Sequence, residues 1–117
     1  MAQQKIDIDI SETSEYRVLK PTGDLDVYTV GSLRDAIASI LEEDKPHVVV
    51  DLDSVPFMDS SGLGALMGGV RRLREGGGDL AIACTREQHL KLFTITGFGE
   101  GVSIAPTVEE AAQGFRD

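Results

Sequence analysis

The amino-terminal part of the chain alternates between apolar and polar residues. Ile6, Ile8 and Ile10 are separated by polar side chains, and this period of two predicts a strand with one solvated face. Strand-like residues resume from Tyr16 to Leu19 after a polar turn. We therefore expect the fold to open with two antiparallel strands.

Further along, four segments carry apolar residues at helical spacing. They are Val30 to Leu41, Ser61 to Arg74, Arg86 to Thr96 and Val108 to Phe115. The glycine run 76–78 ends the second segment, and Thr107 is a candidate amino cap for the last. The pattern predicts four amphipathic helices.

Short apolar runs lie between these helices. His47 to Leu52 is β-branched and nearly continuous, which is typical of a central strand, and Asp79 to Ala83 and Val102 to Ala105 are further candidates. Strands that alternate with helices are joined by right-handed parallel crossovers. The order of elements predicts an α/β fold with a mixed sheet and helices packed on it.

Composition narrows the classes of protein that the chain fits. Its 117 residues suit one domain, expected over residues 1–117, and its formal charge of -9 opposes binding to nucleic acid or an anionic membrane. The first residues lack a signal-peptide pattern, and apolar runs fall short of the roughly 18 residues that span a bilayer. With Cys84 as the one cysteine, expected to be a packed thiol, we expect a cytoplasmic protein.

The segment between the central strand and the second long helix carries three adjacent polar residues, Asp59, Ser60 and Ser61. The carboxyl end of a strand is where α/β sheets place ligand or partner sites. Asp59 or Ser60 can cap the helix, while Gly62 and Gly64 leave its backbone open to close approach. Two interpretations stay open: a helix cap with small residues for packing, or a contact site.

Enzymatic interpretations of this segment fail on spacing. Ser61 lacks the flanking glycines of a hydrolase elbow, Met67 stands where a dinucleotide loop needs a third small residue, and a phosphate loop is missing. Of the two histidines, His47 begins a strand and His89 is expected at a solvated helix position. Neither suggests a catalytic base or a metal ligand, so we expect no enzyme and no metal site.

The motif from Asp59 to Gly64, Asp-Ser-Ser-Gly-Leu-Gly, resembles the signature of bacterial anti-sigma factor antagonists of the STAS domain family. The loop Gly23 to Asp26 is similar to the family's glycine-acid-aliphatic-aspartate loop, although the family often has glutamate at Asp24. Leu90 to Gly97 resembles its third helix. The likeness in element order runs from about Ile6 to Phe115 and implies a STAS-like sheet, antiparallel at its amino-terminal part, with helices mainly on one face.

This resemblance implies a switch rather than a reaction. Family members are phosphorylated on the second serine by a GHKL-type anti-sigma factor kinase and restored by a PPM-type phosphatase. The resemblance therefore puts the phosphate on Ser61, and ATP and magnesium would belong to the kinase, leaving this chain without a cofactor. It implies a contact surface comprising Asp24, Asp26, Asp59, Ser60, Ser61, Gly62 and Gly64.

Two alternatives remain at this point. Some STAS domains respond to nucleotide, so a nucleotide-responsive regulatory module is the second interpretation. Asp26 could cap the following helix or shape its own loop instead of contacting a partner. In the switch interpretation, a phosphate of about -1.5 to -2 charges near Asp26 and Asp59 changes surface charge with little refolding, and unphosphorylated protein binds the anti-sigma factor and frees the sigma factor.

Overall fold

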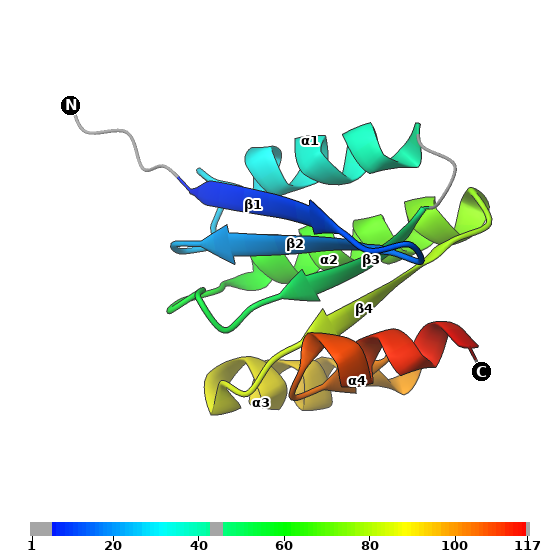
Figure 1. The fold of residues 1–117 in the computed structure, drawn as a ribbon. Coiled ribbons are helices and arrows are strands. Elements are labelled where there is room, and N and C mark those ends of the chain that lie inside the picture. The colour runs from blue at the N-terminus through cyan, green and yellow to red at the C-terminus, as the bar shows by residue number, and fades with distance from the viewer. Residues whose placement is uncertain (1–5, 43–45, 117) are drawn as a thin grey trace.

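The protein is built around a single mixed sheet (Figure 1). The computed structural model describes residues 6–42 and 46–116; the amino-terminal residues considered for a signal peptide lie outside them. The strands are β1 (Asp7–Glu12), β2 (Arg17–Thr22), β3 (His47–Asp51), β4 (Asp79–Ala83) and β5 (Ile104–Ala105). They lie side by side in sequence order, with β1 and β2 antiparallel and every later pair parallel. The predicted mixed sheet is confirmed.

Helices cover both faces of this sheet unequally. Their bounds are α1 (Val30–Leu41), α2 (Ser60–Glu75), α3 (Glu87–Thr96) and α4 (Val108–Ala112). Figure 1 shows α1 and α2 together on one side of the strands and the short α4 on the other. The main core contains buried residues of α1, α2 and α3, which confirms that the helices lie mainly on one face.

The alternation of side chains along the strands explains the two faces. In β3, Val48 and Val50 belong to the main core, whereas Val49 points to the face covered by α4. Ala81 of β4 lies beside Val49 on that second face. Because Ala81 and Ala83 on this face are small, α4 packs close to the sheet, and the three valines of β3 are fully buried.

Element boundaries differ most from the prediction in three places. β2 continues through Pro21, which is tolerated because the ladder to β3 covers only residues 17–19 of that strand. β5 is two residues long, since residues 101 and 102 form a bend. The terminal helix ends at Ala112 and continues as a 3-10 turn, Gln113–Arg116, where Gly114 lowers the helix propensity.

Candidate functional site around Ser61

The amino terminus of α2 is fixed by Asp59. Its Oδ1 accepts hydrogen bonds from the backbone N–H of Ser61, at 2.8 Å, and of Gly62, at 3.3 Å. These amides have no partner within the helix, so the carboxylate satisfies them and opposes the positive end of the helix dipole. Of the two candidate caps, Asp59 is the one used. Ser60 is exposed and Ser61 is half-buried at the first turn.

The loop that carries Asp24 and Asp26 is attached to the same helix terminus. Leu25 forms a bridge with Met58: its N–H donates to the carbonyl of Phe57 at 2.9 Å, and its carbonyl accepts from Asp59 N–H at 3.1 Å. Gly62 packs on this bridge, because a Cβ there would lie 3.1 Å from the Leu25 carbonyl. Two loops far apart in sequence therefore form one surface around the Asp-Ser-Ser motif.

Asp26 shapes its own loop, as its structural interpretation predicted. Its Oδ1 accepts from the Tyr28 N–H at 2.9 Å, and its backbone carbonyl accepts from the N–H groups of Thr29 and Val30. Thr29, which was not predicted as a site residue, is buried and completes the turn by donating its hydroxyl to the Asp24 carbonyl at 2.7 Å. Asp24 is half-buried, and the contact role of both aspartates stays a prediction.

The segment leading into the motif is held by the two residues that precede α3. Oδ1 of Asp53 accepts from the N–H and the hydroxyl of Thr85, at 2.7 and 3.0 Å, and Arg86 Nε donates to the Asp53 carbonyl at 2.9 Å. These contacts restrain the loop from both its side chain and its backbone. The loop that leads to Ser61 is therefore held by residues more than thirty positions later in the chain.

His89 adds a buried contact to this attachment, and the expectation of a solvated His89 is wrong. Its side chain is 2 % exposed, and its Nε2 lies 2.6 Å from the carbonyl oxygen of Val55. Buried polar groups need such partners, and the imidazole matches a carbonyl that the turn would leave inside the protein. The burial of His89 depends on a hydrogen-bond partner in a distant loop. Such a partner leaves no periodic pattern in the sequence, so helical spacing could not predict that His89 is buried.

Neither histidine is placed as a base for Ser61. His89 is engaged with Val55, and the ring of His47 lies against Phe115, with centroids 5.1 Å apart, near the face covered by α4. Within residues 6–42 and 46–116, no group of three or more His, Cys, Asp or Glu side chains is arranged to hold a metal ion. The arrangement around Ser61 presents a half-buried hydroxyl at the first turn of a helix, beside exposed loop residues.

Large apolar side chains are exposed on the loops of this site. Tyr28 is 78 % exposed, Val27 is 65 % exposed, and Phe57 is 52 % exposed. Val27 and Tyr28 directly follow Asp26, and Phe57 precedes Asp59 by two residues and is bonded through its carbonyl to Leu25. Clustered apolar exposure marks contact surfaces more than catalytic clefts. These three residues were not predicted from the sequence, although their position in turns beside the acidic residues was an available signal.

The two glycines of the motif have different structural roles. Gly62 is buried, and a Cβ there would come within 2.5 Å of Met58 Cγ. Gly64 is exposed, and its Cβ would meet nothing within 4 Å. Gly62 therefore belongs to the packing interpretation, whereas Gly64 leaves helix backbone open to another molecule, as the contact interpretation requires.

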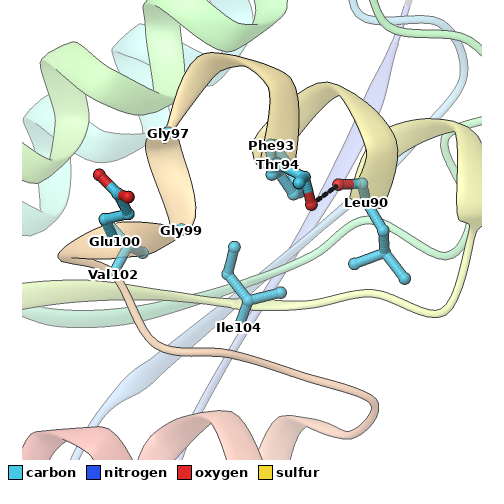
Figure 2. Close-up of a pocket in the computed structure, with 8 residues that line it drawn as sticks. All are labelled: Leu90, Phe93, Thr94, Gly97, Gly99, Glu100, Val102 and Ile104. Atoms are coloured by element: carbon cyan, nitrogen blue, oxygen red, sulfur yellow. Dashed lines mark hydrogen bonds between the residues drawn. The ribbon is translucent and has the colours of Figure 1, made fainter.

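A hollow of about 440 Å³ lies elsewhere, between α3 and β5 (Figure 2). Figure 2 shows Leu90, Phe93 and Ile104 lining it, and Glu100 at its end near Gly97. The lining includes none of the predicted site residues, and its acidic side chain, Glu100, would repel a phosphate. This hollow does not favour the nucleotide-responsive alternative.

Cys84 directly follows β4 and is a packed thiol, as predicted. Its side chain is 2 % exposed and belongs to the main core. Burial raises the pKa of the thiol above its usual value, with a smaller opposing effect from its contact with the Arg86 carbonyl. No helix in the described part of the chain is long and apolar enough to cross a membrane.

Comparison with known proteins assigns the family. The model of the STAS domain matches residues 7–111, and the chain therefore belongs to the STAS domain family. An anti-sigma-B factor antagonist of Staphylococcus aureus is 30 % identical over 92 residues, which cover 79 % of this chain and 85 % of the relative. The resemblance inferred from the Asp-Ser-Ser-Gly-Leu-Gly motif is confirmed.

Solved structures agree with this assignment. The anti-sigma factor antagonist SpoIIAA in its unphosphorylated form is 27 % identical with a TM-score of 0.76, and the alignment covers 94 % of this chain and 96 % of SpoIIAA. The phosphorylated form of the Bacillus cell fate determinant SpoIIAA is 28 % identical with a TM-score of 0.70, over 92 % and 97 % of the two chains. The mixed sheet and the helices described above match the fold of these antagonists.

Proposed function

We propose that this protein is an anti-sigma factor antagonist whose binding is switched off by phosphorylation of Ser61. The observation that carries the proposal is the position of Ser61 at the first turn of α2, beside an Asp59 cap and among exposed apolar side chains. A STAS relative solved in both unphosphorylated and phosphorylated forms supports a switch of this kind. The chain contributes a hydroxyl and a surface, and performs no chemistry itself.

The cap explains how a phosphate would act. Asp59 already accepts from the N–H groups of Ser61 and Gly62, so a phosphate on Ser61 gains little from these amides. Its charge of about -1.5 to -2 would instead be added beside that carboxylate. Because the helix is capped either way, the expected change is in surface charge and shape, with little refolding.

The added phosphate on Ser61 would have a large effect on the affinity of a partner for this surface. An interface that closes over a neutral hydroxyl and the apolar side chains of Val27, Tyr28 and Phe57 would have to accommodate a dianion. Like charges brought together at an interface cost several kcal/mol, and about 1.4 kcal/mol is already tenfold in affinity. The partner that fits this scheme is a GHKL-type anti-sigma factor kinase, which supplies ATP and magnesium, and a PPM-type phosphatase reverses the modification in the cytoplasm.

A pull-down from a bacterial lysate tests the proposal, using wild-type protein with Ser61→Ala and Ser61→Asp. Mass spectrometry identifies the captured proteins and any phosphate on the bait. We expect wild type and Ser61→Ala to capture the kinase, Ser61→Asp to capture it poorly, and only wild type to gain phosphate. Capture of the kinase by none of them, with Ser61 unmodified, would contradict the proposal. Nucleotide binding to the purified protein would then be measured.

A further inference from the structure

A groove of about 210 Å³ runs between α1 and α2 and is lined by three arginines. Arg34 comes from α1, and Arg71 and Arg72 come from the second half of α2. Gly64 and Gly68 form part of its wall, and a Cβ at either position would meet nothing within 4 Å. The groove is therefore an open strip of helix backbone lined by arginine side chains from both helices.

These arginines differ from the other arginines described. Arg17, Arg74 and Arg116 form ion pairs with Glu12, Asp79 and Glu15, at 3.1, 2.9 and 2.9 Å, and Arg86 donates to Asp53. The side chains of the groove arginines are exposed, and within residues 6–42 and 46–116 they make no hydrogen bond or ion pair. In a chain of net charge -9, three cations that have no carboxylate partner among the described residues share one groove.

The groove continues from the proposed switch. Ser61, Gly64, Gly68 and Arg71 follow one another at spacings of three, four and three, which places them along one face of α2. At 1.5 Å per residue, the arginine lies about 15 Å along the helix from the serine. A protein surface that covers Ser61 is thus in position to continue along the groove.

We propose that this groove docks an acidic segment of the protein partner that covers Ser61, a proposal that rests on the function proposed above. Guanidinium groups pair with carboxylates through two parallel hydrogen bonds, and the open glycine backbone lets a segment approach closely. A nucleotide is a poorer fit, because ligand pockets usually enclose about 300 to 1,000 Å³. The net charge disfavours nucleic acid.

The contact in the groove should respond to salt concentration but not to phosphorylation of Ser61. It does not involve the Ser61 hydroxyl, so phosphorylation leaves its charges unchanged. Because the arginines are exposed, their attraction for an acidic segment increases the rate of association and is weakened by salt. The groove would hold and orient the partner, and the region around Ser61 would decide whether the complex persists.

Binding of the anti-sigma factor kinase to a double variant, Arg71→Glu with Arg72→Glu, tests the groove. The matched control is Lys20→Glu with Lys91→Glu, which reverses the same charge at exposed positions on β2 and α3. We expect the groove variant to lose at least ~10-fold in affinity at low salt, the loss to shrink at high salt, and the control to change by less than ~3-fold. Equal affinity of the groove variant and the control would overturn the proposal.

Two further measurements separate this proposal from the proposed function. If Ser61→Asp binds the kinase as tightly as wild type, the switch fails, while the comparison of arginine and lysine variants still decides the groove. If wild type binds no kinase, a hexaglutamate peptide serves as the ligand instead. It is titrated into the full chain, and NMR follows the titration. Chemical-shift changes of the Gly64 and Gly68 amides that vanish in the arginine variant support docking in the groove, and unchanged shifts overturn it. Melting curves confirm that each variant is folded.

Discussion

The Oδ1 atom of Asp59 lies 2.8 Å from the backbone nitrogen of Ser61. The residue proposed to receive a phosphate is therefore held through its own amide by a carboxylate two positions earlier. One side chain fixes the start of α2 and adds negative charge beside the hydroxyl. These structural and electrostatic contributions of Asp59 can be separated by mutation.

Replacing Asp59 tests its two contributions. Asp59→Ala removes the acceptor for two helix amides, and we expect it to lower the free energy of unfolding by about 1 kcal/mol. Asp59→Asn keeps an oxygen acceptor and removes only the charge, so its stability should lie within about 0.5 kcal/mol of wild type. Urea unfolding measures both variants. An equal loss in both would mean that the charge, rather than the hydrogen bonds, stabilises the helix.

Alanine at Gly62 should destabilise the fold. The new Cβ would come within 2.5 Å of Met58 Cγ and 3.1 Å of the Leu25 carbonyl, so the two loops must move apart. Crowding of this kind costs about 1 to 3 kcal/mol, visible as a lower denaturation midpoint. Wild-type stability in Gly62→Ala would show that the bridge between Leu25 and Met58 adapts freely.

Alanine at Gly64 should have the opposite effect on stability. Its Cβ would enter open space on an exposed helix face, and alanine is the better helix former by up to about 1 kcal/mol. The same methyl group would stand between the α2 backbone and a bound partner. We expect equal or higher stability with weaker kinase binding, measured by calorimetry; unchanged affinity would remove Gly64 from the contact surface.

Loss of the His89 side chain should loosen the loop before the motif. His89→Leu keeps an apolar body but leaves the buried carbonyl of Val55 without its partner at 2.6 Å. An unsatisfied buried acceptor costs about 1 to 3 kcal/mol, and hydrogen exchange should increase around Val55. Gln88→Ala, at an exposed neighbour, is the control and should change stability by less than about 0.5 kcal/mol.

Cys84 should make the free energy of unfolding decrease at alkaline pH. Because burial raises the pKa of this thiol in the folded state, the unfolded chain loses the proton first as pH rises. Its contribution to stability is full below the ordinary thiol pKa of about 8.5 and declines above it. Cys84→Ala should lack this component of the pH dependence. A native thiol that reacts with an alkylating reagent as fast as in urea would contradict its burial.

Much of the fold could be predicted from the sequence because its signals are local. The bounds of α1 and β4 were predicted to the residue, since apolar spacing and adjacent turn residues determine them. Thr107 caps α4 as expected, accepting from the Glu110 N–H at 3.1 Å. These features depend on residues within one turn of each other.

The site could be predicted only in part because its remaining features depend on contacts between distant segments. The motif at Ser61 was recognisable from its resemblance to the STAS signature. The burial of His89 depends on Val55, 34 residues earlier, and the groove depends on how Arg34 of α1 lies against α2. Periodicity says which face of a helix is apolar, but not which exposed side chains meet across two helices.

The affinity of the anti-sigma factor kinase for phosphorylated and unphosphorylated protein tests the central claim most directly. Intact-mass analysis first establishes that one phosphate is present and that Ser61→Ala takes up none, and isothermal titration calorimetry then measures binding of each form. We predict that the phosphate on Ser61 weakens binding at least ~100-fold, or about 2.7 kcal/mol, with little change in melting temperature. Equal affinities of the two forms, or phosphate on Ser61→Ala, would contradict the account.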